Sequence, residues 1–395
     1  MPKNKERIAE IINRGVENVY PSKDFLQELL NSDKKLILYL GIDPTGPSLH
    51  LGHAISLMKL AQFQKLGHKI IMLIGSFTAM IGDPTDKMAT RQPLTREQVL
   101  TNCEKYKEQA SALISFTGDN PAEIKFNSDW LDKLNFKEIV ELASNFTVQQ
   151  MLERDMFENR INEGKPIGLH EFLYPLMQGY DSVAMDVDGE IGGNDQTFNM
   201  LAGRTLLKSL KNKEKFVLTT KLLTDSSGKK MGKSEGNMLR LDDSASDKFG
   251  KVMSWSDDMI INGFKLCSFE SDEKISEIEK SLEAGKNPRD LKLLLAESIV
   301  KIYHGESEAK KQVENFINTF SKGEKPQNIE EFSLAGKSLV EVLVESGLVS
   351  SKADAKRNIE QNGVKINDIV CSDPNKTVAS GDVIQKGKRF FVKIK

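Results

Sequence analysis

The sequence contains few cysteines and no long apolar run. Its three cysteines, Cys103, Cys267 and Cys371, form no closely spaced pair, and the charged first ten residues lack the apolar segment of a secretory signal. The longest apolar runs, near Leu36–Leu40 and Ile70–Ile74, are far shorter than the roughly 20 residues that a membrane-spanning helix needs. We therefore expect a cytoplasmic protein without disulfide bonds or a membrane segment.

The chain also lacks a strong excess of either charge. Its 395 residues include 55 Lys and Arg against 57 Asp and Glu, and a formal net charge of -2 identifies no class of partner. Apolar residues make up 39% of the chain, enough to bury a full core, and the length predicts two or three domains. The sequence shows no clustered set of metal ligands, so we expect no structural metal.

The small net charge conceals an uneven distribution. From Lys337 to the end there are eleven Lys and Arg against seven Asp and Glu, so this segment is +4 and the remainder is -6. A basic C-terminal segment is typical of nucleic-acid binding. A lysine-rich surface without such a role explains the charge equally well, so charge alone leaves both interpretations open.

Apolar patterning predicts an α/β architecture. The runs Leu36–Ile42 and Lys69–Ile74 predict two buried strands, joined by a helix that we expect Ser48 to cap. Thr95 begins the next helix with a capping-box pattern. Strand, helix, strand and helix in this order predict a right-handed crossover and a parallel sheet.

The remaining segments are predicted to be mainly helical up to the C-terminal region. A mostly helical stretch is expected from about Leu131 to Ala184, followed by extended segments at Asp186–Ile191 and Phe216–Leu222. Beyond Lys230 the pattern is helical and charged through about Phe320.

The first motif that suggests chemistry is His50-Leu51-Gly52-His53, directly after the first predicted strand and its Gly/Pro loop. Histidines three residues apart share one face of a helix. At a helix start they lie beside unpaired N–H groups and the positive end of the helix dipole, which together favour a phosphate. Taken alone, such a pair is more often a capping or surface feature than a nucleotide site.

The second motif is Lys229-Lys230-Met231-Gly232-Lys233-Ser234, within a polar stretch that we expect to be a loop. Lysines on a closing loop neutralise charge that develops on a polyphosphate in a transition state. Taken alone, a segment of Lys, Gly and Ser is more often an ordinary loop.

Together and in this order, the two motifs resemble the HIGH and KMSKS signatures of the class I aminoacyl-tRNA synthetases. Gly232 departs from the second signature by replacing its central serine, while the lysines are present. Segments 39–45, 82–84, 174–181 and 192–196 resemble motifs of the bacterial-type tyrosyl-tRNA synthetases. This resemblance extends through almost the whole region up to the second signature and includes the closing segment.

The resemblance implies roles for individual residues. The residues implied to bind tyrosine are Tyr39 and Asp181 at the phenol hydroxyl, Asp83, Tyr174 and Gln178 at the ammonium group, and Gln196 near the carboxylate. The residues implied to contact ATP are Gly41, Asp43, His53, Asp195, Lys233 and Ser234. The residues implied to act in catalysis on the phosphates are Thr45, His50, His53, Lys87, Arg91, Lys230 and Lys233.

The residue types are consistent with these roles. Asp83 is a suitable counter-ion for an ammonium group, and one helix can present Tyr174, Gln178 and Asp181 on the same side. A carboxylate such as Asp181 within an apolar helix requires a partner, because burying an unpaired charge is costly. Leu176 and Met177 are interpreted as core residues.

The closing segment resembles the small RNA-binding module named after a ribosomal small-subunit protein. Short helices are expected at Ser338–Gly347 and Lys352–Gln361, followed by extended segments near 363–367 and 380–384. The charges expected to face RNA are Lys352, Lys356, Arg357 and Lys365. A small α/β cap with ordinary surface lysines is the alternative.

The resemblance implies a Rossmann-like catalytic domain over residues 1–229, a helical anticodon-recognition domain over 230–321, a linker at 322–336 and the RNA-binding domain at 337–395. It also implies L-tyrosine, ATP with Mg²⁺ and a tyrosine-specific tRNA as substrates, and a homodimer whose interface is the helical insertion at about 131–168. A tryptophanyl synthetase and an RNA-binding protein that has lost catalysis remain the rival interpretations.

Overall fold

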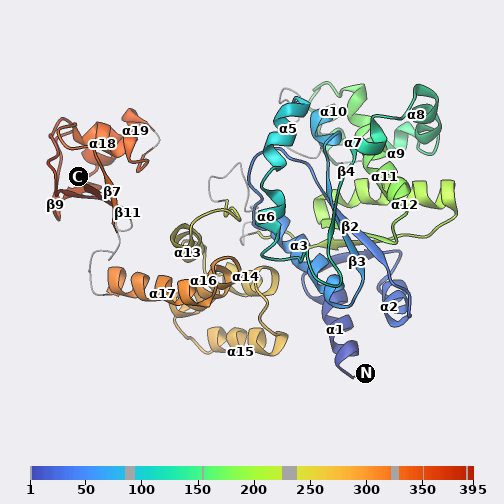
Figure 1. Ribbon diagram of the computed structural model, residues 1–395, viewed down its shortest axis with the longest axis horizontal. Helices are drawn as coiled ribbons and strands as arrows, with labels where there is room; N and C mark the ends of the chain where they lie inside the picture. Colours follow the sequence, from blue (N-terminus) through green and yellow to red (C-terminus); the bar gives the residue numbers. More distant parts are fainter. Residues whose placement is uncertain are drawn as a thin grey trace. The chain divides into compact units, whose positions relative to one another are not determined.

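The computed structural model divides the chain into two units, Met1–Glu306 and Ser307–Lys395 (Figure 1). It describes residues 2–84, 94–153, 155–224, 238–321, 329–349, 351–387 and 390–395. Among these residues, no helix is both long enough and apolar enough to cross a membrane.

The described part of the first unit contains a six-stranded sheet in the order β1-β6-β5-β2-β3-β4. Its strands are β1 (Val16–Tyr20), β2 (Ile37–Ile42), β3 (Lys69–Ile74), β4 (Glu123–Phe126), β5 (Gly189–Gly193) and β6 (Phe216–Thr220). Strands β2 to β6 run parallel, whereas β1 pairs with β6 in the antiparallel direction. The predicted parallel sheet is confirmed, with one antiparallel edge strand added.

The strand order defines a reversal between β2 and β5. From β2 the chain continues to β3 and β4 on one side, and β5 and β6 then extend the sheet on the other. In open α/β sheets, ligands bind outside the carboxyl ends of the strands at such a reversal.

The helices of the first unit cover this sheet and extend beyond it. Their bounds are α1 (Pro2–Asn13), α2 (Lys23–Asn31), α3 (Leu51–Lys65), α4 (Thr78–Ile81), α5 (Arg96–Cys103), α6 (Tyr106–Ala110), α7 (Ser128–Leu131), α8 (Phe136–Ala143), α9 (Val148–Leu152), α10 (Asp155–Asn162), α11 (Tyr174–Met185), α12 (Thr197–Lys211), α13 (Ala245–Met253), α14 (Met259–Cys267), α15 (Asp272–Glu283) and α16 (Pro288–His304), with 3₁₀ helices η1 (Leu169–Phe172) and η2 (Asn194–Gln196). Helices α7 to α10 gather beside α11 (Figure 1), which confirms the predicted helical stretch before β5.

Two predicted helix starts have different outcomes. Thr95 caps α5 in a capping box with Gln98, as expected. The N-cap of α3 is His50 rather than Ser48, whose hydroxyl instead donates to Oδ2 of Asp242 at 2.7 Å. The prediction for Ser48 is therefore wrong, because this serine is used in a contact with a distant part of the chain.

Close packing of α11 against α12 depends on a glycine. A Cβ at Gly179 would lie 2.9 Å from Cδ1 of Leu206 and 3.1 Å from the backbone carbon of Ala202. The two helices would therefore separate if a larger residue replaced Gly179. This packing places one face of α11 over Tyr39 of β2, within a core that includes Val183.

The second unit has its own sheet and core. Its elements are α17 (Glu306–Ser321), β7 (Glu330–Phe332), α18 (Leu339–Glu345), α19 (Lys352–Glu360), β8 (Val364–Ile366), β9 (Ile369–Val370), β10 (Val383–Lys386) and β11 (Phe390–Ile394). The described strands are ordered β7-β11-β10-β8-β9. The predicted pair of short helices is confirmed. The predicted linker at 322–336 contains β7, which pairs with β11, so the C-terminal sheet begins before Lys337.

Candidate active site

The predicted site residues on strands and helices converge at the carboxyl ends of β2, β3 and β5. Tyr39 lies within β2, Asp43 directly follows it, and Gln196 ends η2 after β5. Helix α11 supplies Tyr174, Gln178 and Asp181, as its spacing predicts.

Asp43 connects the end of β2 to two other elements. The hydroxyl of Tyr174 donates to Oδ2 of Asp43 at 2.7 Å, and the hydroxyl of Thr78 donates to Oδ1 at 2.7 Å. A Cβ at position 75 would lie 1.8 Å from Oδ1, so only glycine fits there. Burial raises the pKa of Asp43 to about 7, while the two hydrogen bonds act in the opposite direction.

Asp181 has the partners that its burial requires. The indole Nε1 of Trp130 donates to Oδ1 at 2.7 Å, and Nδ2 of Asn127 donates to Oδ2 at 3.3 Å. Burial nevertheless raises the pKa of Asp181 well above its ordinary value. An ionised carboxylate accepts up to about four hydrogen bonds, and a protonated one keeps acceptor capacity beside its O–H donor, so Asp181 can accept a further hydrogen bond in either state.

Trp130 and Asn127 were not among the predicted site residues. Both follow β4, a strand that the apolar pattern does not predict, because its sequence Glu-Ile-Lys-Phe alternates over only four residues. The sequence signal that points to them is the requirement of Asp181 for hydrogen-bond donors.

Tyr39 is completely buried, and its hydroxyl lies 3.0 Å from Oγ of Ser182. Burial raises the pKa of Tyr39 well above its ordinary value, and the negative charges of Glu190 and Asp181 act in the same direction. The phenol therefore remains protonated near neutral pH. Tyr39 and Asp181, predicted to share one ligand hydroxyl, are thus positioned by different hydrogen-bond partners.

Gln196 and Asp83 are brought into direct contact, since Nε2 of Gln196 donates to Oδ2 of Asp83 at 2.7 Å. Asn199 in turn donates to Oε1 of Gln196 at 2.9 Å and orients its amide. Asp195, also in η2, is exposed.

Two further predicted residues lie close to Asp43 in the chain. The backbone N–H of Thr45 donates to the carbonyl of Asp43 at 2.8 Å, and Thr45 is partly buried. Gly41, the fifth residue of β2, is exposed, which leaves its backbone accessible to a flat group.

The two histidines of the first signature cap helix α3. Nδ1 of His53 accepts from the backbone N–H of His50 at 3.1 Å, and Nδ1 of His50 accepts from that of Gly52 at 3.1 Å. Their rings stack with centroids 3.8 Å apart. Because each Nδ1 is an acceptor, the proton of each neutral ring is on Nε2.

The segment that follows the second signature forms backbone hydrogen bonds with the residues at the start of α3. The backbone N–H of Leu51 donates to the carbonyl of Leu239 at 2.9 Å, and that of Leu241 donates to the carbonyl of Leu49 at 2.9 Å. His50 lies between these two backbone hydrogen bonds and forms an isolated antiparallel β-bridge with Arg240. The predicted residues Lys87, Arg91, Lys230, Lys233 and Ser234 lie outside the described residues.

The predicted RNA-facing charges lie on α19 and β8 of the second unit. Lys352, Lys356 and Arg357 are exposed on α19, and Lys365 on β8 is partly buried. Arg357 also pairs with Asp354 at 2.8 Å on the same helix.

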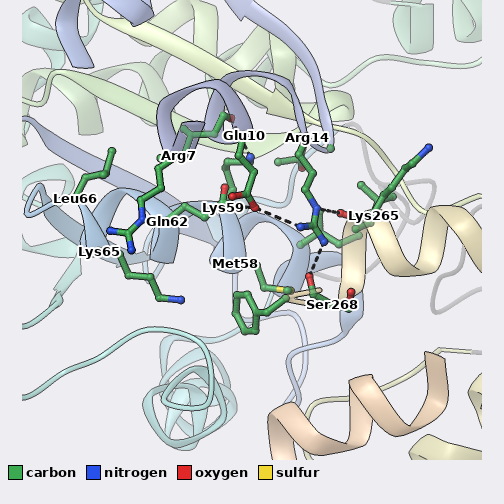
Figure 2. Close-up of a pocket in the computed structure, with 16 residues that line it drawn as sticks. Arg7, Glu10, Arg14, Met58, Lys59, Gln62, Lys65, Leu66, Lys265 and Ser268 are labelled. Atoms are coloured by element: carbon green, nitrogen blue, oxygen red, sulfur yellow. Dashed lines mark hydrogen bonds and ion pairs between the residues drawn. The ribbon is translucent and has the colours of Figure 1, made fainter. Parts of the chain in front are cut away.

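A separate cavity of about 450 Å³ lies between α1, α3 and the end of α14 (Figure 2). Arg14 lines this cavity and connects α1 to the end of α14, because its guanidinium donates to the carbonyls of Phe264, Lys265 and Ser268 at 3.1, 3.1 and 3.0 Å. Lys59, which is almost fully buried, donates to the carbonyl of Ile11 at 2.9 Å. None of the predicted site residues lines this cavity.

Comparison with known proteins gives two matching family models. The model described as "tRNA synthetases class I (W and Y)" matches residues 31–322, and the "S4 domain" model matches residues 338–384.

Individual relatives match over the whole chain. The chain is 45% identical to the tyrosine–tRNA ligase of Haemophilus ducreyi over 397 residues, covering 100% of this chain and 99% of that protein. It is 45% identical to that of Mannheimia succiniciproducens over 390 residues, covering 98% of each. A solved structure of a C-terminally truncated mitochondrial tyrosyl-tRNA synthetase from Coccidioides posadasii superposes with a TM-score of 0.65 at 26% identity, covering 78% of this chain and 91% of that one.

Proposed function

The chain belongs to the family of class I tRNA synthetases for tryptophan and tyrosine, and we propose that within it the chain is a tyrosine–tRNA ligase. The enzyme activates L-tyrosine with ATP to form tyrosyl-adenylate and pyrophosphate, and then transfers tyrosine to the 3′ end of its tRNA. The observation that carries the proposal is the buried pair formed by Tyr39 of β2 and Asp181 of α11. The 45% identity to tyrosine–tRNA ligases along the whole chain supports it.

The choice of tyrosine over tryptophan rests on hydrogen-bonding capacity. Tyr39 supplies a protonated phenol, and Asp181 can accept a further hydrogen bond beside those from Trp130 and Asn127. A ligand hydroxyl satisfies both groups, whereas an indole carries only one donor and no acceptor.

The ammonium group of tyrosine is assigned to Asp83, Tyr174 and Gln178. The contact between Asp83 and Gln196 places a carboxylate and an amide together where α4 and η2 approach each other. Gln196 would then lie near the substrate carboxylate, which is the nucleophile of the first step.

ATP is assigned to the start of α3 and the end of β2. Gly41, Asp43, His53 and Asp195 would contact the adenosine end. Thr45, His50, Lys87, Arg91, Lys230, Lys233 and Ser234 would hold the phosphates, and Mg²⁺ would enter with ATP. Proton-bearing Nε2 atoms on stacked histidines suit phosphate oxygens. The pairing of Leu239 and Leu241 with Leu49 and Leu51 supports placing the second signature near the first.

Catalysis in this proposal requires no covalent enzyme intermediate. The tyrosine carboxylate attacks the α-phosphate, the bond to the β-phosphate breaks, and pyrophosphate leaves with its electron pair. His50, Lys230 and Lys233 stabilise the charge that develops on the departing phosphates, and the remaining residues position the two reactants.

The second unit is proposed to bind the tRNA through Lys352, Lys356, Arg357 and Lys365. Its match to the S4 domain model and the exposure of the three charges on α19 support this assignment. Phosphate contacts from such residues supply affinity without reading the base sequence. We expect the enzyme to act in the cytoplasm, where tRNA and ATP are available.

We also propose a homodimer through the helical insertion. Four large apolar side chains in this insertion are each more than half exposed, namely Phe136, Val140, Val148 and Ile161, and so is Leu169 directly after it. Exposed apolar groups concentrated in one region mark protein interfaces, and a second copy is the most common partner.

Exchange of pyrophosphate into ATP, measured with each of the twenty amino acids, tests the function. Tyrosine alone is expected to support exchange. Exchange that depends on tryptophan identifies the other member of the family, and no exchange with any amino acid identifies a protein that has lost catalysis.

A further inference from the structure

A buried ion pair lies directly behind the proposed tyrosine site. Lys215, which precedes β6, pairs with Glu190 of β5, and their side chains are 0% and 2% exposed. Apolar residues of similar size would be equally or more stabilising at such a position, so stability alone does not explain two charges there.

The surroundings are shaped to admit the ammonium group of Lys215. A Cβ at Gly203 of α12 would lie 2.6 Å from Nζ of Lys215 and 2.5 Å from Oγ of Ser182. Any other residue at position 203 would therefore displace both groups.

One end of the pair orients Gln178. Nε2 of Gln178 donates to Oε1 of Glu190 at 3.0 Å. A carboxylate only accepts hydrogen bonds, so the nitrogen of the Gln178 amide must face Glu190 and its oxygen must face elsewhere. An acceptor oxygen is the group that a substrate ammonium requires. A neutral glutamine at position 190 would tolerate either orientation of the Gln178 amide.

The other end of the pair orients Tyr39. Nζ of Lys215 donates to Oγ of Ser182 at 2.8 Å, and the same oxygen lies 3.0 Å from the hydroxyl of Tyr39. An ammonium only donates, so it occupies one lone pair of Ser182 and restricts how that hydroxyl bonds to Tyr39. Nζ also lies 5.6 Å from the centroid of the Tyr39 ring.

We propose that the Lys215–Glu190 pair is a positioning element of the tyrosine site, which holds the Gln178 amide for the ammonium group and, through Ser182, the Tyr39 hydroxyl for the phenol. The pair touches no substrate and acts through these two residues. The inference rests on the proposed function and adds to it two residues that together determine affinity and selectivity for tyrosine.

The test uses the double variant Glu190→Gln/Lys215→Met, which removes both charges and nearly preserves volume. Tyrosine-dependent exchange should show a KM for tyrosine raised about tenfold, the equivalent of one hydrogen bond, with the KM for ATP changed less than about twofold. The preference for tyrosine over phenylalanine, as a ratio of kcat/KM values, should fall by a similar factor. Glu190→Gln alone should also raise the KM for tyrosine and lower the preference for tyrosine over phenylalanine.

Lys59→Met is the matched control, because Lys59 is also a buried lysine but faces the separate cavity (Figure 2). It should keep the parent's KM for tyrosine and its preference over phenylalanine, whatever its melting temperature. Unchanged values in the double variant, or equal increases in KM for tyrosine and for ATP, would overturn the proposal. Absence of tyrosine-dependent exchange in the parent would instead contradict the proposed function.

Discussion

The hydroxyl of Tyr174 donates to Oδ2 of Asp43 at 2.7 Å and thereby ties helix α11 to the carboxyl end of β2. The connection continues through Thr78, which donates to Asp43, and Asn127, which donates to Thr78 and to Asp181. Groups assigned to the ammonium end and the phenol end of tyrosine are therefore joined by one network of buried hydrogen bonds. Such networks hold their members in a single arrangement when every member is satisfied.

Asp43→Asn should remove one component of the pH dependence of stability. The folded pKa of Asp43, about 7, lies above its ordinary value of 3.8, so the fold favours the protonated form. The stability that this proton confers is present below about pH 4 and is lost as the pH rises to about 7. As the pH rises from about 4 to about 7, the melting temperature of the substrate-free parent should therefore fall relative to that of the substrate-free variant. Above about pH 7 the difference between the two melting temperatures should stay constant. A constant difference over that range would contradict the assignment.

Asp181→Asn should weaken the rejection of phenylalanine. In the parent, phenylalanine leaves the buried polar groups of Asp181 and Tyr39 without a ligand hydroxyl, which costs about 1–3 kcal/mol, or roughly fivefold to 150-fold. The ratio of kcat/KM for tyrosine to that for phenylalanine in the exchange assay should fall by a factor within this range. The idea fails if the variant discriminates as sharply as the parent.

Lys233→Ala should slow adenylate formation by about 10²–10³-fold with little change in tyrosine affinity, because its charge is needed only as pyrophosphate leaves. Pre-steady-state measurement of the adenylate, with tyrosine binding measured separately, distinguishes these effects. Lys221→Ala is the matched control, since Lys221 is an exposed lysine outside the signature. Normal activation kinetics in Lys233→Ala would remove this residue from the mechanism.

Deletion of residues 329–395 should separate the two half-reactions. The cut includes β7, because β7 pairs with β11 and would be left without its sheet if the deletion began at Lys337. Tyrosine activation should persist, since the assigned active-site residues lie in the first unit. Charging of tRNA should collapse at ordinary tRNA concentrations and recover partly when tRNA is raised.

A point-variant version of this test replaces Lys352, Lys356 and Arg357 with Gln in the full chain. The salt dependence of tRNA binding should flatten, because each lost phosphate contact reduces the magnitude of the slope of log K against log salt by about 0.7–0.9. Equal loss of activation and charging in the deletion would indicate that the second unit supports the first structurally. Unchanged charging in both proteins would show that the unit is not the RNA-binding element.

Phe136→Glu should convert the proposed homodimer to a monomer. Phe136 is 81% exposed on α8, and a charge there cannot be buried against a second copy without a large cost. Sedimentation at micromolar concentration should show half the parent's mass. Ile369→Glu is the control, because Ile369 is also highly exposed but lies on β9 of the second unit. A parent that sediments as a monomer would contradict the dimer.

Elements set by local pattern were predictable from the sequence. Continuous apolar runs identify β2 and β3, since strands covered on both faces need apolar side chains throughout. The capping box at Thr95 identifies the start of α5, because cap chemistry involves only neighbouring residues. The spacing of Tyr174, Gln178 and Asp181 on one helix is likewise a local property, and Figure 1 shows that helix, α11, beside the sheet.

Other features were decided only when distant segments came together. The antiparallel pairing of β1 with β6 and the place of β7 beside β11 depend on partners far along the chain. In the sequence, Lys215 is one lysine among several charged neighbours and resembles a surface residue. Its burial against Glu190 follows from the packing of α12 over the sheet. A charge can be buried only where the folded chain supplies its partner, and no local pattern records that partner.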